Sequence, residues 1–212
     1  MLLQPIRLLP ARERVASVLR KAILSRDLTE GQQLTLETVA GQLGVSKTPV
    51  REAFLLLETE GLLQMLPNKS VTVLGVNEKN LREHYQVRAA LESEAAALCC
   101  RPGCGLSAVE QVMEQSRCAV SAGHFEDYGN LNQAFHVALW ESCGNDRLRS
   151  MLSVMWNGLS LHAAETVESY AKKSFEEHCG IWEAVQNRDE AAARERMHRH
   201  IIRSMEDMLT NL

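Results

Sequence analysis

The stretch from residue 78 to residue 209 constrains the fold most strongly, because helical apolar patterns in it are separated only by short breaks. Residues 101–103, 122–123, 144–145 and 187–189 supply turn and cap residues such as glycine, proline, asparagine and aspartate. Between these breaks and a further one near residue 170, the sequence predicts six helices, over residues 78–100, 106–122, 125–143, 147–168, 172–186 and 190–209. Short connections favour antiparallel neighbours, so we expect a mainly α fold with a C-terminal antiparallel six-helix bundle.

The first 75 residues have a different pattern. A helix is predicted over residues 12–26, and its apolar face is formed by Val15, Val18, Leu19, Ala22 and Ile23. A short helix over residues 36–43 follows, with Thr35 as N-cap and Gly44 at its end, and a third helix runs from the Ser46 cap to about residue 60. Apolar runs at residues 62–66 and 71–74 flank Pro67-Asn68-Lys69-Ser70 and predict a β-hairpin. This order is typical of a winged helix-turn-helix domain over residues 1–75, joined to a helical domain over residues 76–212.

Composition supports this division. Aromatic residues make up only 5% of the chain, which has 12 Gly and 5 Pro, and this argues against a β-sandwich, a collagen or a disordered chain. The 23 Lys and Arg and the 27 Asp and Glu are unevenly spread along the chain. Residues up to Gly75 include 9 basic and 7 acidic residues, a net charge of +2, whereas the rest includes 14 basic and 20 acidic residues, a net charge of −6. A positive module joined to a larger acidic one is compatible with a nucleic-acid-binding domain attached to a sensor domain.

No apolar run approaches the ~18 residues of a membrane span, and the N-terminus lacks the features of a signal peptide, so we expect a cytoplasmic protein that does not enter a membrane. The six cysteines include a cluster at Cys99, Cys100 and Cys104. Because no second cysteine pair completes a four-ligand zinc set, we expect free thiols.

The start of the third helix carries the candidate DNA contacts. Ala40 and Gly44 permit a tight crossing and turn, while Val50, Leu55 and Leu56 are expected to anchor the helix to the core. Short hydroxyls and long cations at a helix start suit phosphate and base-edge contacts in the major groove. The residues expected there are Ser46, Lys47, Thr48 and Arg51.

The segment Leu43-Gly-Val-Ser-Lys-Thr-Pro-Val-Arg-Glu-Ala53 resembles the signature of GntR-type bacterial transcription regulators, and Tyr85-Gln-Val-Arg-Ala-Ala-Leu-Glu92 is similar to the opening of the FCD ligand-binding domain of the FadR subgroup. Six C-terminal helices resemble its shorter, VanR-type form. The resemblance implies that Ser46, Lys47, Thr48 and Arg51 contact operator DNA and that Lys69 reaches the minor groove or the backbone. It departs from the family at the wing tip, where Lys69-Ser70 replaces the frequent Arg-Gly, so a turn with positive φ is harder to form. Since a palindromic operator matches a two-fold protein, we expect a homodimer.

Three histidines of the second domain form a candidate metal site. Asn132 and His136 lie four residues apart on one helix face, and His178 and His200 lie at similar distances from the turn near Arg188. Three imidazoles and one side-chain oxygen suit a divalent ion, Zn²⁺ or Ni²⁺. These positions also match the family's metal-binding Asp and three His, except that Asn132 replaces the Asp; a neutral amide binds a cation more weakly, which leaves a weakened or a lost ion as alternatives. His198 is expected on another face, and His84, His124 and His162 have no assigned partner.

The resemblance further implies a small organic acid as effector, with its carboxylate bridged to the metal. Arg88 or Arg149 could add a cation, although Arg88 could equally form a helix-face salt bridge with Glu92, at i+4. Met151, Met155 and Trp156 are expected to be core residues.

The sequence therefore favours a DNA-binding regulator with a metal-dependent effector site. One alternative within this class is that the ion itself is the effector. A metal-dependent enzyme is the alternative from another class; it lacks a Glu or Asp general base beside the histidines and gives the helix-turn-helix no role, so we predict that the protein is not an enzyme.

Overall fold

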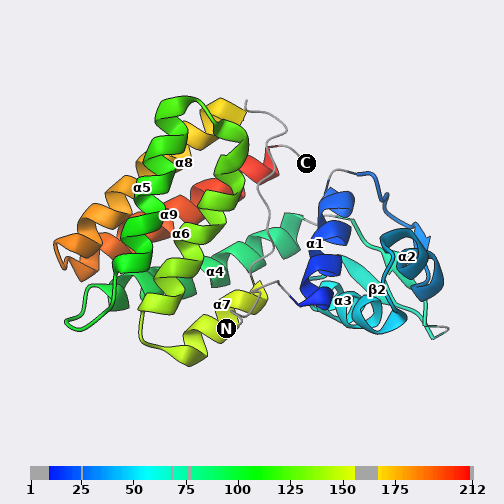
Figure 1. Cartoon of the computed structure of the whole chain (residues 1–212). Coiled ribbons are helices and arrows are strands. Elements are labelled where there is room, and N and C mark those ends of the chain that lie inside the picture. The colour runs from blue at the N-terminus through cyan, green and yellow to red at the C-terminus, as the bar shows by residue number, and fades with distance from the viewer. Residues whose placement is uncertain (1–9, 25, 68, 76–77, 156–166, 211–212) are drawn as a thin grey trace, which may run out of the picture. The chain divides into compact units, whose positions relative to one another are not determined.

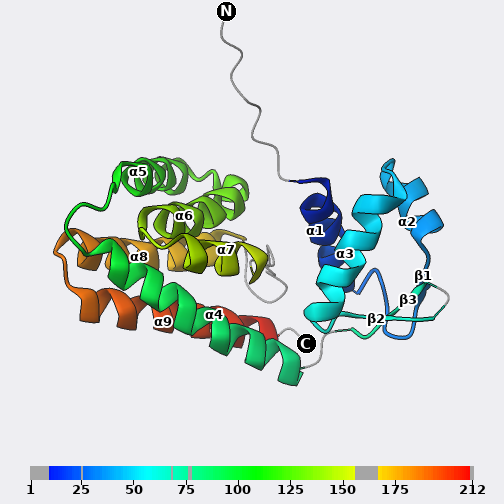
Figure 2. The same cartoon turned by 90° about the horizontal axis from the view of Figure 1, so that it is seen from below.

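A computed structural model of the chain describes residues 10–24, 26–67, 69–75, 78–155 and 167–210 (Figures 1 and 2). The chain divides into two compact units, Met1–Asn80 and Leu81–Leu212. The fold is mainly helical with one small sheet, as the sequence predicts. No helix in these ranges is both long enough and apolar enough to cross a membrane.

The first unit contains three helices and a three-stranded sheet. Its elements are α1 (Ala11–Leu24), β1 (Gln33–Leu34), α2 (Leu36–Leu43), α3 (Lys47–Thr59), β2 (Leu63–Met65) and β3 (Val71–Val73). The predicted hairpin is confirmed, because β2 and β3 pair antiparallel with Gln64 opposite Thr72. The sequence analysis missed β1, which adds to the other edge of β3 with Leu34 opposite Val71. Two residues are too few to show an alternating apolar pattern, so β1 left no signal in the sequence.

Local chemistry sets the bounds of α2 and α3. The Thr35 side chain accepts a hydrogen bond from the Thr38 amide, and Gly44 ends α2 in the left-handed region at φ 63°. Both assignments follow the prediction. Ser46 is the N-cap residue of α3, but its hydroxyl makes no capping hydrogen bond, so the predicted cap interaction is wrong. An uncapped, exposed hydroxyl remains free for another partner.

The core of the first unit joins α1, α2 and α3 to the sheet. Val15, Val50, Phe54 and Val71 are among its buried residues. Two predicted core positions are wrong: Val18 is 50% exposed and Leu55 is 49% exposed. Val18 and Leu55 each stand next to a buried residue, Leu19 and Phe54, and successive residues of a helix do not share a face.

A buried ion pair fixes α1 against the end of α3. The Arg20 guanidinium donates to both carboxylate oxygens of Glu60, at 2.8 Å from Nε and 2.5 Å from Nη2. Arg20 is only 3% exposed, so this pairing compensates the cost of removing a charge from water.

The wing between β2 and β3 turns at Lys69, which adopts φ 65°. Its amide donates to the Leu66 carbonyl at 3.0 Å, and the Ser70 carbonyl accepts from the Leu66 amide at 2.9 Å. The turn with positive φ therefore forms without a glycine, because Lys69 itself adopts this conformation. For a residue with a Cβ atom, the left-handed conformation typically costs about 1–2 kcal/mol.

The second unit contains the remaining described helices. They are α4 (Glu78–Cys99), whose first residues belong to the first unit, α5 (Ser107–Ala122), the short 3-10 helix η1 (Phe125–Asp127), α6 (Tyr128–Ser142), α7 (Asp146–Met155), α8 (Val167–Gln186) and α9 (Glu190–Leu209). The predicted break near residue 170 is wrong, because α8 already begins at Val167. Met151 is 44% exposed, which corrects its assignment to the core, and Trp156 lies outside the described residues.

Helices α4, α8 and α9 form one antiparallel group (Figure 2). The Tyr85 hydroxyl near the start of α4 meets the Met208 sulfur near the end of α9, while Glu94 pairs with Arg194 at 2.6 Å. Between α8 and α9, Lys173 pairs with Asp207. The contact between α8 and α9 confirms the antiparallel packing predicted from their short connection, whereas the packing of α4 against α9 was not predicted.

Candidate metal centre and nucleic-acid interface

Three buried imidazoles from three helices converge inside the second unit. His136 lies on α6, His178 on α8 and His200 on α9, and the three are 0%, 0% and 2% exposed. The Nε2 atom of His200 lies 3.3 Å from that of His178 and 3.2 Å from that of His136. One potential ligand atom from each of the three histidines lies within 4.8 Å of the others. Among the described residues, no other group of three or more His, Cys, Asp or Glu side chains meets this criterion. The distances from the turn at Arg188 thus placed His178 and His200 at the same level of an antiparallel pair.

Asn132 lies one turn before His136 on α6 and is 4% exposed. Its Oδ1 atom is buried and has no hydrogen-bond partner among the described residues. An unsatisfied buried amide oxygen costs about 1–3 kcal/mol, so a partner supplied from outside the chain would remove a penalty. The four-residue spacing places Asn132 and His136 on the same face of α6.

The outward nitrogen of each imidazole has its own protein partner. Nδ1 of His136 lies 2.5 Å from the Glu92 carboxylate, and Nδ1 of His200 lies 2.6 Å from Glu177. Nδ1 of His178 lies 3.3 Å from the Tyr128 hydroxyl, and its ring stacks on Phe135 at 4.0 Å between centroids. All three rings are therefore held from behind with Nε2 facing inward.

The electrostatics keep two of the rings uncharged. Burial, strengthened by the neighbouring imidazoles, lowers the pKa of His178 well below its usual value; burial and His136 lower that of His200 to about 4, against the opposing effect of Glu177. Burial acts to raise the pKa of Glu92, but Arg88 and His136 outweigh it and bring the value to about 2. Neutral imidazoles carry the lone pairs that a metal ion requires.

The residues present fit a divalent ion. Nitrogen ligands at the Zn–N distance of ~2.1 Å in tetrahedral geometry lie about 3.4 Å apart, close to the two Nε2 separations given above. The unpaired Asn132 oxygen supplies a fourth potential ligand. A bound ion would supply a Lewis-acidic positive charge in a buried setting.

The two arginines expected at an effector occupy different surroundings. Arg88 is 4% exposed and donates to Glu92 at 2.5 Å, so the salt bridge considered as its alternative role does form. Arg149 lies on α7, is about half exposed and pairs with Asp146 at 3.2 Å. Among the other histidines, His198 is exposed, as expected for its different helix face, and His162 lies outside the described residues.

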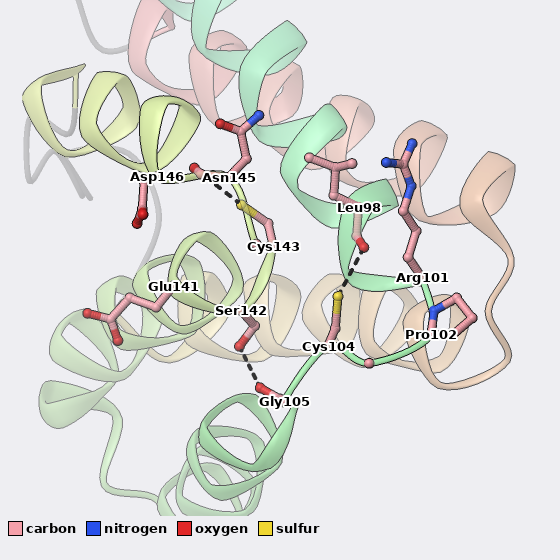
Figure 3. Close-up of a pocket in the computed structure, with 12 residues that line it drawn as sticks. Leu98, Arg101, Pro102, Cys104, Gly105, Glu141, Ser142, Cys143, Asn145 and Asp146 are labelled. Carbon is pink, nitrogen blue, oxygen red and sulfur yellow. Dashed lines mark hydrogen bonds between the residues drawn. The ribbon is translucent and has the colours of Figure 1, made fainter.

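The cysteines are free thiols, as predicted. Cys104 and Cys143 line a cavity of about 810 Å³ between the loops that follow α4 and α6, shown in Figure 3. Their sulfur atoms face backbone carbonyls: Cys104 donates to Leu98 at 3.3 Å and Cys143 to Trp140 at 3.1 Å. Burial raises the pKa of Cys143, which disfavours its thiolate form.

The residues expected to contact DNA lie on the surface of the first unit. All of them are exposed: Ser46, Lys47, Thr48, Arg51 and Lys69. The Lys47 ammonium pairs with Glu37 of α2, and this contact lowers the pKa of the Glu37 carboxyl. Exposed ion pairs are weak, so this lysine can exchange its partner at little cost.

Sequence reasoning missed the residues behind the histidines. Tyr128 carried no signal beyond its apolar character, and Glu92 was noted only for its i+4 spacing from Arg88. Glu177 precedes His178 in the sequence, yet it contacts His200 of the next helix. Such contacts depend on how helices are rotated against each other, which spacing within one helix does not specify.

Comparison with known proteins identifies both parts of the chain. The model of the gntR family of bacterial regulatory proteins matches residues 11–73, and that of the FCD domain matches residues 83–203. The HTH-type transcriptional repressor RspR of Escherichia coli (strain K12) is 25% identical over 206 residues, covering 91% of this chain and 86% of the repressor. The HTH-type transcriptional regulator YdhC of Bacillus subtilis (strain 168) is 27% identical over 194 residues, covering 86% and 84%.

The fold is shared with solved structures as well. E. coli McbR/YncC superimposes with a TM-score of 0.70 at 23% identity, covering 96% of this chain and 99% of that protein. A transcriptional regulator from Rhodococcus sp. RHA1 has a TM-score of 0.64 at 22% identity, covering 95% and 98%. Because the relatives and both families are transcription regulators, the prediction that the chain is not an enzyme is confirmed. The chain belongs to the GntR family of DNA-binding transcriptional regulators, with an FCD domain after its helix-turn-helix domain.

Proposed function

We propose that this regulator senses a small carboxylate at a divalent metal site in its FCD domain and changes its affinity for operator DNA in response. The observation that carries the proposal is the convergence of three buried Nε2 atoms; the buried amide oxygen of Asn132, one turn before His136 on α6, has no hydrogen-bond partner among the described residues. His136, His178 and His200 would hold the ion, Zn²⁺ or Ni²⁺, with Asn132 as the oxygen ligand.

The charge of the ligand set favours an anionic effector. Three neutral imidazoles and an amide leave the charge of a bound divalent ion uncompensated, so an effector carboxylate gains a strong attraction there. Arg88 and Arg149 are the candidate cations for the rest of such a ligand. Arg149 is the more accessible, because Arg88 is buried and paired with Glu92.

The DNA half of the proposal assigns the start of α3 to the major groove. Ser46 and Thr48 offer short hydroxyls, Lys47 a cation for phosphate and Arg51 a guanidinium for a base edge. Lys69 would contact the minor groove or the backbone from the wing. We expect a homodimer on a palindromic operator, acting in the cytoplasm, where bacterial operator DNA is located.

Coupling between the two units requires differential binding. An effector changes operator affinity only if it binds more tightly to one arrangement of the DNA-binding units than to another. The proposal therefore predicts that operator DNA changes effector affinity by the same factor that the effector changes operator affinity.

Metal content tests the sensor half. Elemental mass spectrometry of desalted protein loaded with zinc should give about one ion per chain for the unmodified protein and for His198→Ala, and clearly less for His178→Ala. His198 is a matched control because it is an exposed histidine two residues from His200. The absence of bound metal in the unmodified protein, or equal loss in both variants, would contradict the assigned site.

Operator titration separates the effector from the ion. After an operator has been selected from random duplexes, fluorescence anisotropy is measured with EDTA, with zinc, and with zinc plus a panel of mono- and dicarboxylates. The proposal requires that affinity changes when a carboxylate is added to the zinc-loaded protein. A change with zinc alone and none with any carboxylate would make the ion itself the effector.

A further inference from the structure

Two of the three histidines are backed by the same kind of chain: an arginine, then a carboxylate, then the imidazole Nδ1. One chain is Arg88–Glu92–His136 and the other is Arg203–Glu177–His200. They are built from different helices, since the first joins α4 to α6 and the second joins α8 to α9.

In the first chain, Glu92 is fully buried and each of its oxygens is occupied. Oε1 accepts from Arg88 Nε at 2.5 Å, while Oε2 lies 2.5 Å from His136 Nδ1 and accepts from the Trp140 indole at 3.2 Å. Arg88 balances its charge at 4% exposure. A carboxylate fixed by two further donors has one orientation available toward His136.

In the second chain, Glu177 is held by the Arg203 guanidinium. Arg203 Nε donates to Oε1 at 3.0 Å, and its Nη2 atom donates to Oε2 and to the Ser174 hydroxyl. Oε2 then lies 2.6 Å from His200 Nδ1, while the Arg203 Nη2 atom lies 3.3 Å from the same nitrogen. The carboxylate is therefore the much closer partner of Nδ1. The second arm of Arg203 donates to Asp207 at 2.6 Å, so the guanidinium is clamped on both sides.

We infer that Glu92 and Glu177 are positioning residues that fix the proton of His136 and His200 on Nδ1 and so leave both Nε2 lone pairs facing the centre of the histidine cluster. A carboxylate only accepts hydrogen bonds, so the imidazole nitrogen that it contacts must carry the proton. The inference deepens the proposed metal site, on which its functional meaning rests.

The arrangement has a consequence for the metal-free cluster. Nε2 of His136 and Nε2 of His200 lie 3.2 Å apart, close enough for one to donate to the other. If both protons are held on Nδ1, neither nitrogen can donate, and two lone pairs face each other. The carboxylates therefore prevent the pair from satisfying itself internally and keep it ready for a cation.

His178 differs from the other two histidines, because the partner of its Nδ1 atom is a hydroxyl and not a carboxylate. Its Nδ1 faces the Tyr128 hydroxyl at 3.3 Å, and a hydroxyl both donates and accepts. Its tautomer is thus not fixed by its partner, so Nε2 of His178 remains able to donate to His200 when no ion is bound.

The test compares Glu92→Gln and Glu177→Gln with two matched controls, Glu94→Gln and Glu183→Gln. Glu94 lies two residues from Glu92 on α4, pairs with Arg194 and is partly exposed. Glu183 lies on α8, pairs with Arg196 and is exposed. Zinc dissociation constants are measured by competition with a chromogenic chelator. We expect roughly 10–100-fold weaker binding for each of the first two variants, and values within about twofold of the unmodified protein for the controls.

A second readout follows the protons directly. In metal-free protein labelled with ¹⁵N-histidine at pH 7.5, long-range ¹H–¹⁵N spectra should show His136 and His200 protonated on Nδ1. Glu92→Gln should alter the His136 pattern alone, and Glu177→Gln that of His200 alone, which a general loss of stability would not produce.

Protons on Nε2 of both residues in the unmodified protein, or unchanged zinc affinity in both folded variants, would overturn the inference. If loss of the buried Glu92 charge prevents Glu92→Gln from folding, Glu177→Gln decides, because Glu177 is 28% exposed. If the unmodified protein binds no zinc, the proposed function fails, while the spectra still decide whether the carboxylates fix the tautomers.

Discussion

Lowering the pH of the metal-free protein should destabilise the FCD domain well above the pH at which carboxylates titrate. His200 has a pKa of about 4 in the folded protein against 6.5 for the free side chain. The unfolded chain therefore binds more protons between these values, and stability is present above pH 6.5 and lost as the pH falls toward 4. Burial shifts His178 in the same direction and adds to the effect.

The expected size follows from this shift. Between pH 7.5 and pH 5, a group with these two pKa values contributes a loss of about 2 kcal/mol in the free energy of unfolding. Glu92 and Glu177 have folded pKa values of about 2, below their ordinary value of 4.5. Their contribution is lost only as the pH falls from 4.5 toward 2, so a measurement at pH 5 isolates the histidines.

Urea unfolding in the presence of EDTA measures the loss. All tryptophans of the chain, Trp140, Trp156 and Trp182, lie in residues 81–212, so their fluorescence reports unfolding of that unit. We expect the transition midpoint to fall between pH 7.5 and pH 5 in the unmodified protein and in His198→Ala, and to fall less in His200→Gln. Equal midpoints at the two pH values in the unmodified protein would refute the reasoning.

Three further predictions concern DNA binding and assembly. If its guanidinium contacts a base, Arg51→Ala should weaken operator binding, measured by fluorescence anisotropy, by about 1–3 kcal/mol. If Lys47 contacts phosphate, Lys47→Ala should reduce the slope of log affinity against log salt concentration by about 1. Unchanged values in both variants would reject the interface. Lys69→Asn should weaken binding while keeping the wing, because asparagine tolerates the positive φ at this position, and an unaltered affinity would remove Lys69 from the contact. Light scattering at micromolar concentration should give the mass of a dimer, and a monomer would contradict the palindromic operator.

The sequence predicted those parts of the fold that depend on local chemistry. Helix α2 has the predicted bounds because Thr35 and Gly44 act through atoms within one turn of the helix ends. Prediction from the sequence failed where the burial or the existence of an element depends on its neighbours in the fold. Leu55 is exposed although it is apolar, and β1 exists only because β3 offers it an edge.

The candidate site shows the same division. The similar distances of His178 and His200 from their turn were enough to predict that these two histidines meet, and His136 lies against His200 as well. The place of Asn132 in a ligand set stays a prediction. The partners on the outward nitrogens were not predicted, because Glu92 reaches His136 across α4 and α6, and Glu177 skips the adjacent His178 to meet His200. Helix rotation determines those pairs.

The balance of buried charge explains why the proposed ligands and the carboxylates behind them must be considered together. Glu92 is already paired with Arg88, and Glu177 with Arg203, so neither carboxylate has its full charge left to neutralise an ion in the histidine cluster. Asn132 adds no charge of its own. A divalent ion held by this neutral set would keep an excess of positive charge in a buried place, which is costly unless an anion joins it. Asn132, where the family has Asp, would therefore have two opposite effects. The amide would bind the ion more weakly than a carboxylate, but the ion would attract an acidic effector more strongly.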